Sequence, residues 1–357
     1  MIPERNLVVV ASEKDDRGDK MRSVVNIYEK TDDETPMYPT IISSEDEKGL
    51  PIPFAALSGL SHGKKKDDLY SVEDSAYIST RFFKIDTKNY PAVIEEAVHI
   101  MDTNGVFAAV EPEGEFDADD LAAMINEDGT VNIDGEGIAY NEDGTFWIAS
   151  EGRGTVGDED RPVESLNFLF HVDETGVILE VVKLPEEVNA LQLRFGFEGV
   201  TTYGEYVVVA FQRVWSDDVG VRIGLYNTEN GMWKFGFYTL DEPSSQNGGW
   251  VGLSDISLLA DGEFYVLERD NQGGPDADIK AIYKINLGVD LDDFEDGSMI
   301  EKQLEVDLIP ILEMSNGLMY EKVEGMAITD KGIYVNNDND GVDDNSGENW
   351  LVNISDY

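Results

Sequence analysis

The chain has 357 residues, 41% of them hydrophobic, and it carries 74 Asp and Glu against 26 Lys and Arg, which gives a formal net charge of −48. An acidic surplus of this size repels nucleic acid and anionic membranes, so we expect neither as a partner. Because cysteine is absent and there are only three histidines, the sequence also excludes disulfides, thiolate sites and an ordinary zinc cluster.

Short strands follow one another along almost the whole chain. Residues 6–44 contain three of them, in the segments NLVVVASE, SVVNIYE and YPTIISSE. From residue 51 onward, a unit of up to four strands joined by turns recurs, most clearly over 135–184, where Asp-Gly and Thr-Gly mark two of the turns. Repeats of roughly 45 residues with this content predict the blades of a β-propeller.

We therefore predict an all-β fold, a six-bladed β-propeller that forms a single domain over 1–357. The approximate blades are 1–50, 51–102, 130–187, 195–243, 250–310 and 320–357. The first blade lacks its inner strand and the last lacks its fourth, so either the chain ends complete one another or an upstream domain of the same protein precedes this chain. The segment near 117–125, DADDLAAMI, predicts one short inserted helix capped by Asp117.

Polar residues mark one face of the predicted disc. In a propeller blade the inner strand begins, and the second strand ends, on the same face. The predicted inner strands open with Glu136, Glu198, Asp255 and Glu324. The predicted second strands close on Glu13, Glu73, Glu151, Gln212, Glu268 and Asp338. Carboxylates gathered near one axis repel one another unless protons or cations compensate, and Ca²⁺ with oxygen ligands is the simplest solution.

The long loops on this face add two further signals. Arg153, Arg213 and Arg269 follow the predicted second strands, where they either bind an anion such as phosphate or pair with the neighbouring carboxylates. The spacing Asn336-x-Asp338-x-Asp340-Gly341 partly fits a calcium-binding loop. The metal ligands that we predict are Glu13, Glu73, Glu136, Glu198, Asp255, Glu324, Asp338 and Asp340.

Several stretches resemble the phytase-like propeller family, which is described as having esterase-like activity of phytase. They are ALSGLSH…LYSVEDS, DGEGIAYNEDGTFWIASEG, FGFEGV, NGGWVGLSDISLLADGEFYVLERD and EKVEGMAI…NNDNDG, and residues 1–50 look like the longer bacterial members. The resemblance implies a β-propeller, an extracytoplasmic (periplasmic or secreted) bacterial setting, and phosphoester chemistry with calcium. The leader that such a setting needs is absent from this chain.

The leading hypothesis is a calcium-dependent phosphoric ester hydrolase that acts on a small anionic phosphoester. One or more Ca²⁺ ions would lie at the channel mouth, the three arginines would bind the substrate, and Glu151 or Glu268 would act as general base. Two alternatives stay open at this point. One is a non-catalytic, calcium-stabilised binding or scaffold propeller, and the other is a calcium-dependent lactonase.

Overall fold

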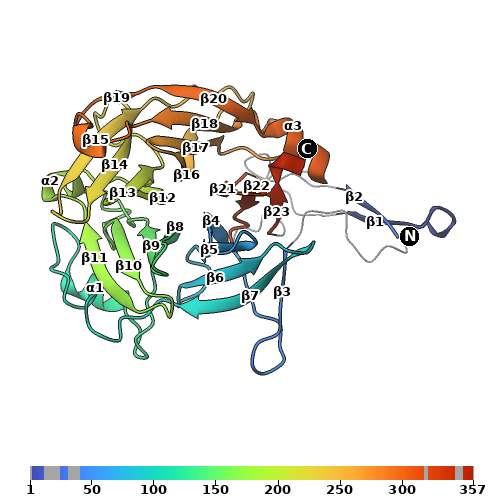
Figure 1. The fold of residues 1–357 in the computed structure, drawn as a ribbon, viewed down its shortest axis with the longest axis horizontal. Coiled ribbons are helices and arrows are strands. Elements are labelled where there is room, and N and C mark those ends of the chain that lie inside the picture. Colours follow the sequence, from blue (N-terminus) through green and yellow to red (C-terminus); the bar gives the residue numbers. More distant parts are fainter. Residues whose placement is uncertain (1, 12–24, 31–40, 317–320, 342–348, 357) are drawn as a thin grey trace.

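The computed structural model describes residues 2–11, 25–30, 41–316, 321–341 and 349–356. Five β-sheets surround a common axis, and each runs outward from an inner strand (Figure 1). The inner strands are β4 (Leu57–His62), β8 (Gly135–Tyr140), β12 (Phe197–Tyr203), β16 (Val251–Ala260) and β21 (Val323–Thr329). The chain is thus a β-propeller, and we number its blades I to V in chain order.

The other strands lie outside the inner ones and pair largely in sequence order. Blade I adds β5 (Asp68–Glu73), β6 (Arg81–Asp86) and β7 (Ala92–His99), and blade II adds β9 (Phe146–Ser150), β10 (Phe168–Val172) and β11 (Ile178–Lys183). Blade III adds β13 (Tyr206–Phe211), β14 (Val221–Asn227) and β15 (Trp233–Tyr238), and blade IV adds β17 (Glu263–Asp270), β18 (Lys280–Asn286) and β20 (Lys302–Asp307). Among the described residues, blade V adds β22 (Gly332–Asn337) and β23 (Leu351–Asn353).

The prediction of six blades is wrong, because the ring closes with five. Each inner strand packs against the next, and β21 of blade V packs against β4 of blade I, which leaves no place for a sixth sheet. In the residues assigned to a first blade, β1 (Leu7–Ala11) and β2 (Val25–Glu29) form a two-stranded hairpin that projects from the ring (Figure 1). Strand β3 (Ile41–Ser43) instead pairs in parallel with β7. A segment without an inner strand has nothing to insert into the ring.

The helices are short and lie outside the sheets. The predicted helix is present as α1 (Ala118–Ala123), and Asp117 caps it by accepting hydrogen bonds from the backbone N–H groups of Asp119 and Asp120. The remaining elements are α2 (Glu186–Asn189), α3 (Ile309–Asn316), β19 (Met299–Ile300), which pairs with β15, and the 3₁₀ turns at Pro3–Arg5, Gly274–Asp276, Leu291–Asp293 and Ile354–Asp356. In the part of the chain that the structure describes, no helix is long and apolar enough to cross a membrane.

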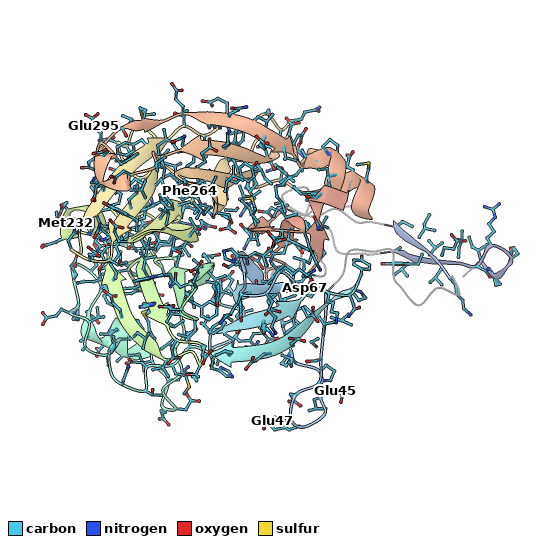
Figure 2. All side chains as sticks on the ribbon, viewed as in Figure 1. Glu45, Glu47, Asp67, Met232, Phe264 and Glu295 are labelled. Atoms are coloured by element: carbon cyan, nitrogen blue, oxygen red, sulfur yellow. The ribbon has the colours of Figure 1, made fainter. Side chains whose placement is uncertain are left out.

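The hydrophobic core lies between neighbouring blades. Strand β13 is buried along its whole length because both of its faces are covered, which explains its continuous apolar run YVVVAF. Figure 2 shows side chains filling the space between the blades, where Phe264 of β17 is fully buried, whereas Glu45 and Glu47 extend from a loop at the periphery. Packing of sheet on sheet therefore holds the inner strands in place around the axis.

Every inner strand has a β-bulge at the same point, and the bulges approach one another closely around the axis. In all five blades the pairing between the first two strands shifts just after the inner strand begins. Four bulges contain a glycine: Gly59, Gly137, Gly199 and Gly325. A Cβ on Gly137 would lie 2.4 Å from the carbonyl oxygen of Glu198 in the next blade, so only glycine fits this close approach.

In blade IV, Asp255 occupies the position of these glycines and closes the axis. Its Oδ1 accepts a hydrogen bond from the N–H of Ile256 at 2.8 Å, and its Oδ2 accepts one from the N–H of Met326 in blade V at 2.7 Å and a longer one from Leu60 in blade I at 3.5 Å. On the far side of this closure the inner strands of all five blades line a small cavity of about 40 Å³. The polar residues at the strand starts therefore form a site that is open on one face only.

Candidate axial site

The register at the ends of the second strands decides which side chains reach the axis. Glu73 pairs with Leu57 and Glu268 pairs with Leu253, whereas Glu151 comes one residue after the last paired residue of its strand. Successive side chains of a strand point to opposite faces, so a shift of one residue changes the side. The counterparts of Glu151, Gln212 and Asp338 in the other two blades are therefore Asp74 and Arg269.

The structure does not bring Glu73 and Glu268 to the axis, because side chains from the outer strands bind both carboxylates away from it. Arg81 donates to both carboxylate oxygens of Glu73, from Nε and Nη2, at 2.7 Å each. Glu268 accepts hydrogen bonds from the Tyr238 hydroxyl at 2.5 Å and from Lys302 Nζ at 2.8 Å. Both carboxylates are fully buried, so their contacts hold strands together and leave neither group open to a ligand.

Asp255 does not contribute its side chain to the site either. The carboxylate of Asp255 is taken up by backbone N–H groups, as described above, and burial raises its pKa well above the usual value. The position in blade IV that corresponds to Glu136, Glu198 and Glu324 is held by Ser254. Glu13 falls outside the described residues.

Two concentric sets of polar side chains do meet at the axis, and we call them together the axial cluster. Its members are Ser58, Asp74, Asp134, Glu136, Glu151, Glu198, Gln212, Ser254, Arg269, Lys322, Glu324, Asp338 and Asp340. Eight of these residues are acidic, whereas only Arg269 and Lys322 are basic. Neighbouring blades are linked through the cluster, as where Ser58 Oγ donates to Glu136 Oε2 at 2.7 Å.

The two cations of the axial cluster lie in one half of it, where they pair with three carboxylates. Arg269 Nη2 donates to Glu324 Oε1, and its Nε donates to Ser254 Oγ at 3.0 Å. Lys322 Nζ lies 2.7 Å from Asp338 Oδ2 and 2.5 Å from Asp340 Oδ1, so both residues of the predicted calcium loop pair with a lysine. The fully buried Arg269 is thereby an internal ion-pair partner, and only its Nη1 has no hydrogen-bond partner.

In the other half, the carboxylates of the described residues have no basic side chain at a comparably short distance. One carboxylate oxygen from each of Asp74, Asp134 and Glu136 lies within 4.8 Å of the others, and each side chain is only partly buried. The closest approach of Lys322 to Asp74 is 4.0 Å. This arrangement of three carboxylates with partial access to solvent fits a hard divalent cation.

The pKa values show excess negative charge in both halves of the axial cluster, because burial also raises the pKa of Asp338, beside Lys322, to about 7. Burial, followed by repulsion from Asp134, raises the pKa of Asp74 to about 7. Burial raises the pKa of Glu151 to about 7 as well, although the N–H of Gly196, which donates to its Oε1 at 2.7 Å, opposes the shift. Burial and repulsion from Asp74 raise the pKa of Glu136 well above its usual value. Without a bound cation, the half that contains Asp74 is therefore protonated in part near neutral pH.

An open pocket of about 330 Å³ adjoins the acidic half, and we call it the arginine pocket. Its lining contains three arginines, Arg153, Arg161 and Arg194, and four carboxylates, those of Asp134, Glu151, Asp160 and Glu164. Arg153 is largely exposed and lies 3.9 Å from Glu164, which makes a weak surface pair. Among the described residues, no carboxylate lies within 4.0 Å of Arg161 or Arg194. In a strongly acidic chain, three arginines with such weak pairing favour an anionic ligand.

Arg213, the third predicted arginine, lies in a neighbouring pocket on the same face. Its guanidinium carbon is 4.8 Å from the ring centre of Phe195 and 4.9 Å from that of Trp250. The pocket has a volume of about 380 Å³ and also involves Asp241 and Glu242. The three predicted arginines thus have three different environments, and only Arg153 lies in the arginine pocket.

The predicted site residues do not include five residues of this region: Asp74, Asp134, Arg161, Arg194 and Lys322. Asp74 and Asp134 each lie within two residues of one that was singled out, so a correct register would have found them. Lys322 precedes β21 directly and could have been found in the same way. Arg161 and Arg194 come from loops, and strand periodicity carries no information about where a loop places its side chains.

The comparisons with known proteins concern the fold and the family. Among curated proteins none matches the chain. A mutant α-L-arabinanase of Cellvibrio cellulosa is 10% identical with a TM-score of 0.42, over 85% of this chain and 92% of that one. The aldose sugar dehydrogenase of Streptomyces coelicolor is 13% identical with a TM-score of 0.36, over 84% and 93%. The family model named phytase-like, with the description "Esterase-like activity of phytase", matches residues 52–341, and this chain therefore belongs to the phytase-like family.

Proposed function

We propose that the protein is a calcium-dependent phosphoric ester hydrolase, and that its reaction takes place where the acidic half of the axial cluster meets the arginine pocket. The observation that carries the proposal is this juxtaposition. Asp134 belongs both to the group of three carboxylates and to the lining of the arginine pocket. A cation site and an anion site that share a residue suit a substrate whose phosphate bridges the two.

Asp74, Asp134 and Glu136 are the residues that would hold Ca²⁺. Their donor set consists of carboxylate oxygens only, as a hard cation prefers, and their mutual repulsion is the force that binding would relieve. Bound there, Ca²⁺ would act as a Lewis acid toward the phosphate oxygens and would lower the charge that an anionic substrate meets.

The remaining roles fall to side chains of the arginine pocket. Arg153, Arg161 and Arg194 bind the phosphate oxygens through charge-assisted hydrogen bonds. Glu151 is the general base: its pKa of about 7 lets it accept a proton from water near neutral pH, and the hydrogen bond from Gly196 fixes its orientation. Glu151 takes a proton from water as the water oxygen adds to phosphorus and the P–O ester bond breaks. The departing alkoxide takes up a proton, from Glu151 or from solvent, and leaves as the alcohol. Glu268 takes no part, because its oxygens are already bound.

The test measures hydrolysis of p-nitrophenyl phosphate and bis(p-nitrophenyl) phosphate with calcium and with a chelator. We expect calcium-dependent turnover that Glu151→Gln lowers by about 10² to 10⁴-fold, the usual contribution of general base catalysis. Asp134→Asn should lower both turnover and calcium affinity. Glu142→Gln is the matched control, because Glu142 is exposed in the turn between β8 and β9 on the opposite face.

The same experiment separates the two alternatives. If calcium raises the melting temperature but neither phosphoester is hydrolysed, the chain is a calcium-stabilised binding or scaffold propeller. If only lactones are hydrolysed, it is a calcium-dependent lactonase. If calcium neither binds nor changes stability, the acidic half is neutralised by protons and the metal part of the proposal is wrong.

A further inference from the structure

Arg213 is a half-buried cation without a counter-ion. Among the described residues, no carboxylate lies within 4.0 Å of its guanidinium, and its side chain donates no hydrogen bond. Burial alone lowers its pKa, as expected for a cation that has no anionic neighbour. In a chain with 74 acidic residues, a pocket that leaves one arginine unpaired is prepared for an external anion.

Two aromatic residues restrict how Arg213 can bind a ligand. Its guanidinium lies over the rings of Phe195 and Trp250 at nearly equal distances, 4.8 and 4.9 Å, so both rings contact it. The two ring centres are 5.5 Å apart, so both rings lie toward one side of the guanidinium. Its other side stays available, with the fork of N–H groups that matches two oxygens of one planar acid. The backbone of Trp250 is itself fixed, because its N–H donates to Asn271 Oδ1 at 2.8 Å.

Phe195 is held in a strained conformation between the two pockets. Its φ angle is +74°, in the left-handed region that bulky residues rarely adopt. The buried Trp215 supports this conformation by donating from Nε1 to the Phe195 carbonyl at 3.0 Å. The Phe195 ring thereby contacts Arg194 of the arginine pocket, at 4.4 Å, as well as Arg213. One ligand that spans Phe195 could reach both arginines.

We propose that the pocket around Arg213 binds a carboxylate on the leaving group of the substrate, so that the substrate is a phosphoester of a hydroxy acid. The inference rests on the proposed function, which places the phosphate in the arginine pocket. A carboxylate suits the Arg213 pocket better than a second phosphate does. One guanidinium balances the single negative charge of a carboxylate. The exposed Glu242 of the same pocket repels a phosphate dianion more strongly than it repels a carboxylate monoanion.

Calorimetric titration of the full chain with benzoate and, separately, with inorganic phosphate tests the proposal without any turnover. We expect Arg213→Gln to weaken benzoate binding by at least about tenfold, the effect of one bidentate charge-assisted pair, and to leave phosphate affinity unchanged. Arg153→Gln is the control and should show the opposite pattern. Arg213→Lys keeps the charge but loses the fork, so it should restore only part of the benzoate affinity.

Three results would overturn the proposal: benzoate that does not bind, benzoate affinity that is equal in Arg213→Gln and the unaltered protein, and phosphate affinity that falls as far as benzoate affinity in Arg213→Gln. The last result would indicate a second phosphate site in place of a carboxylate site. Because the titration does not measure hydrolysis, its outcome is separate from that of the phosphatase assay. Circular dichroism spectra of the variants show whether each one is folded.

Discussion

Replacing Glu151 with glutamine should stabilise the protein while it removes the proposed general base. Burial raises the pKa of Glu151 from 4.5 to about 7, so ionisation of this side chain opposes folding once the pH exceeds the unfolded value. The stability that the protonated form contributes is complete below about pH 4.5 and is lost as the pH rises through 7. The glutamine side chain would not ionise, and its amide oxygen can still accept the hydrogen bond from Gly196.

The expected gain in the free energy of unfolding follows from the size of the pKa shift of Glu151. A displacement from 4.5 to about 7 corresponds to at most about 3 kcal/mol at pH 8. Glu151 is only partly buried, and an amide oxygen accepts a weaker hydrogen bond from Gly196 than a carboxylate does, so we expect a gain of about 1–2 kcal/mol. Near pH 5 the gain should be smaller by more than half, because the unfolded carboxyl is then only partly ionised.

Urea denaturation in chelator, near pH 5 and near pH 8, measures this difference directly. Glu142→Gln serves as the control and should leave the free energy of unfolding within about 0.5 kcal/mol at both pH values. The reasoning is refuted if Glu151→Gln destabilises the protein at pH 8, or if its effect is the same at both pH values. Saturating calcium should reduce the advantage of the variant, because the cation stabilises the ionised cluster.

Three further predictions concern other parts of the molecule. Lys280→Met should lower the free energy of unfolding in urea by about 3–5 kcal/mol, because the buried Nζ lies 2.8 Å from Asp270 Oδ1 and also donates to three carbonyls. As a control, Lys284→Met, at the partly exposed pair with Glu263, should lower it by less than about 1 kcal/mol. Gly137→Ala should cost about 1–3 kcal/mol or more in the same assay, because its Cβ would meet the neighbouring bulge at 2.4 Å. Calcium at about 100 times its Kd should stabilise the protein by about 2.7 kcal/mol, seen as a rise in Tm, and Asp74→Asn should remove most of that rise.

The sequence was informative about the repeat and less so about its register. Four-strand units with tight turns on one side and long loops on the other predict a propeller and indicate the face on which the axial cluster lies. The segments VED at 72–74 and ERD at 268–270, however, offer two and three adjacent polar residues, and only the partner strand decides which one faces the axis. Alternation near the end of a strand gives no such information, so Glu73 and Glu268 were assigned to the axis in place of Asp74 and Arg269.

The number of blades depends on tertiary contacts that no local pattern records. Residues 1–50 have strand-forming sequences like those of the other units, but ring closure requires an inner strand on both sides of each contact. Strand β21 meets β4 directly, so the ring is complete without them. The arginine pocket could not be predicted for a related reason: Arg153, Arg161 and Arg194 are up to 41 residues apart and are brought together only by loops from blade II and the connection to blade III.

Because the axis is closed below the site, it limits how ions and ligands can reach the axial cluster. Because Asp255 and the glycine bulges seal the floor of the site, an ion, a ligand and any product share a single entrance. A polymeric ligand cannot thread through the ring and can present only an end or a side branch. A ligand that occupies this opening therefore excludes the next one until it has left.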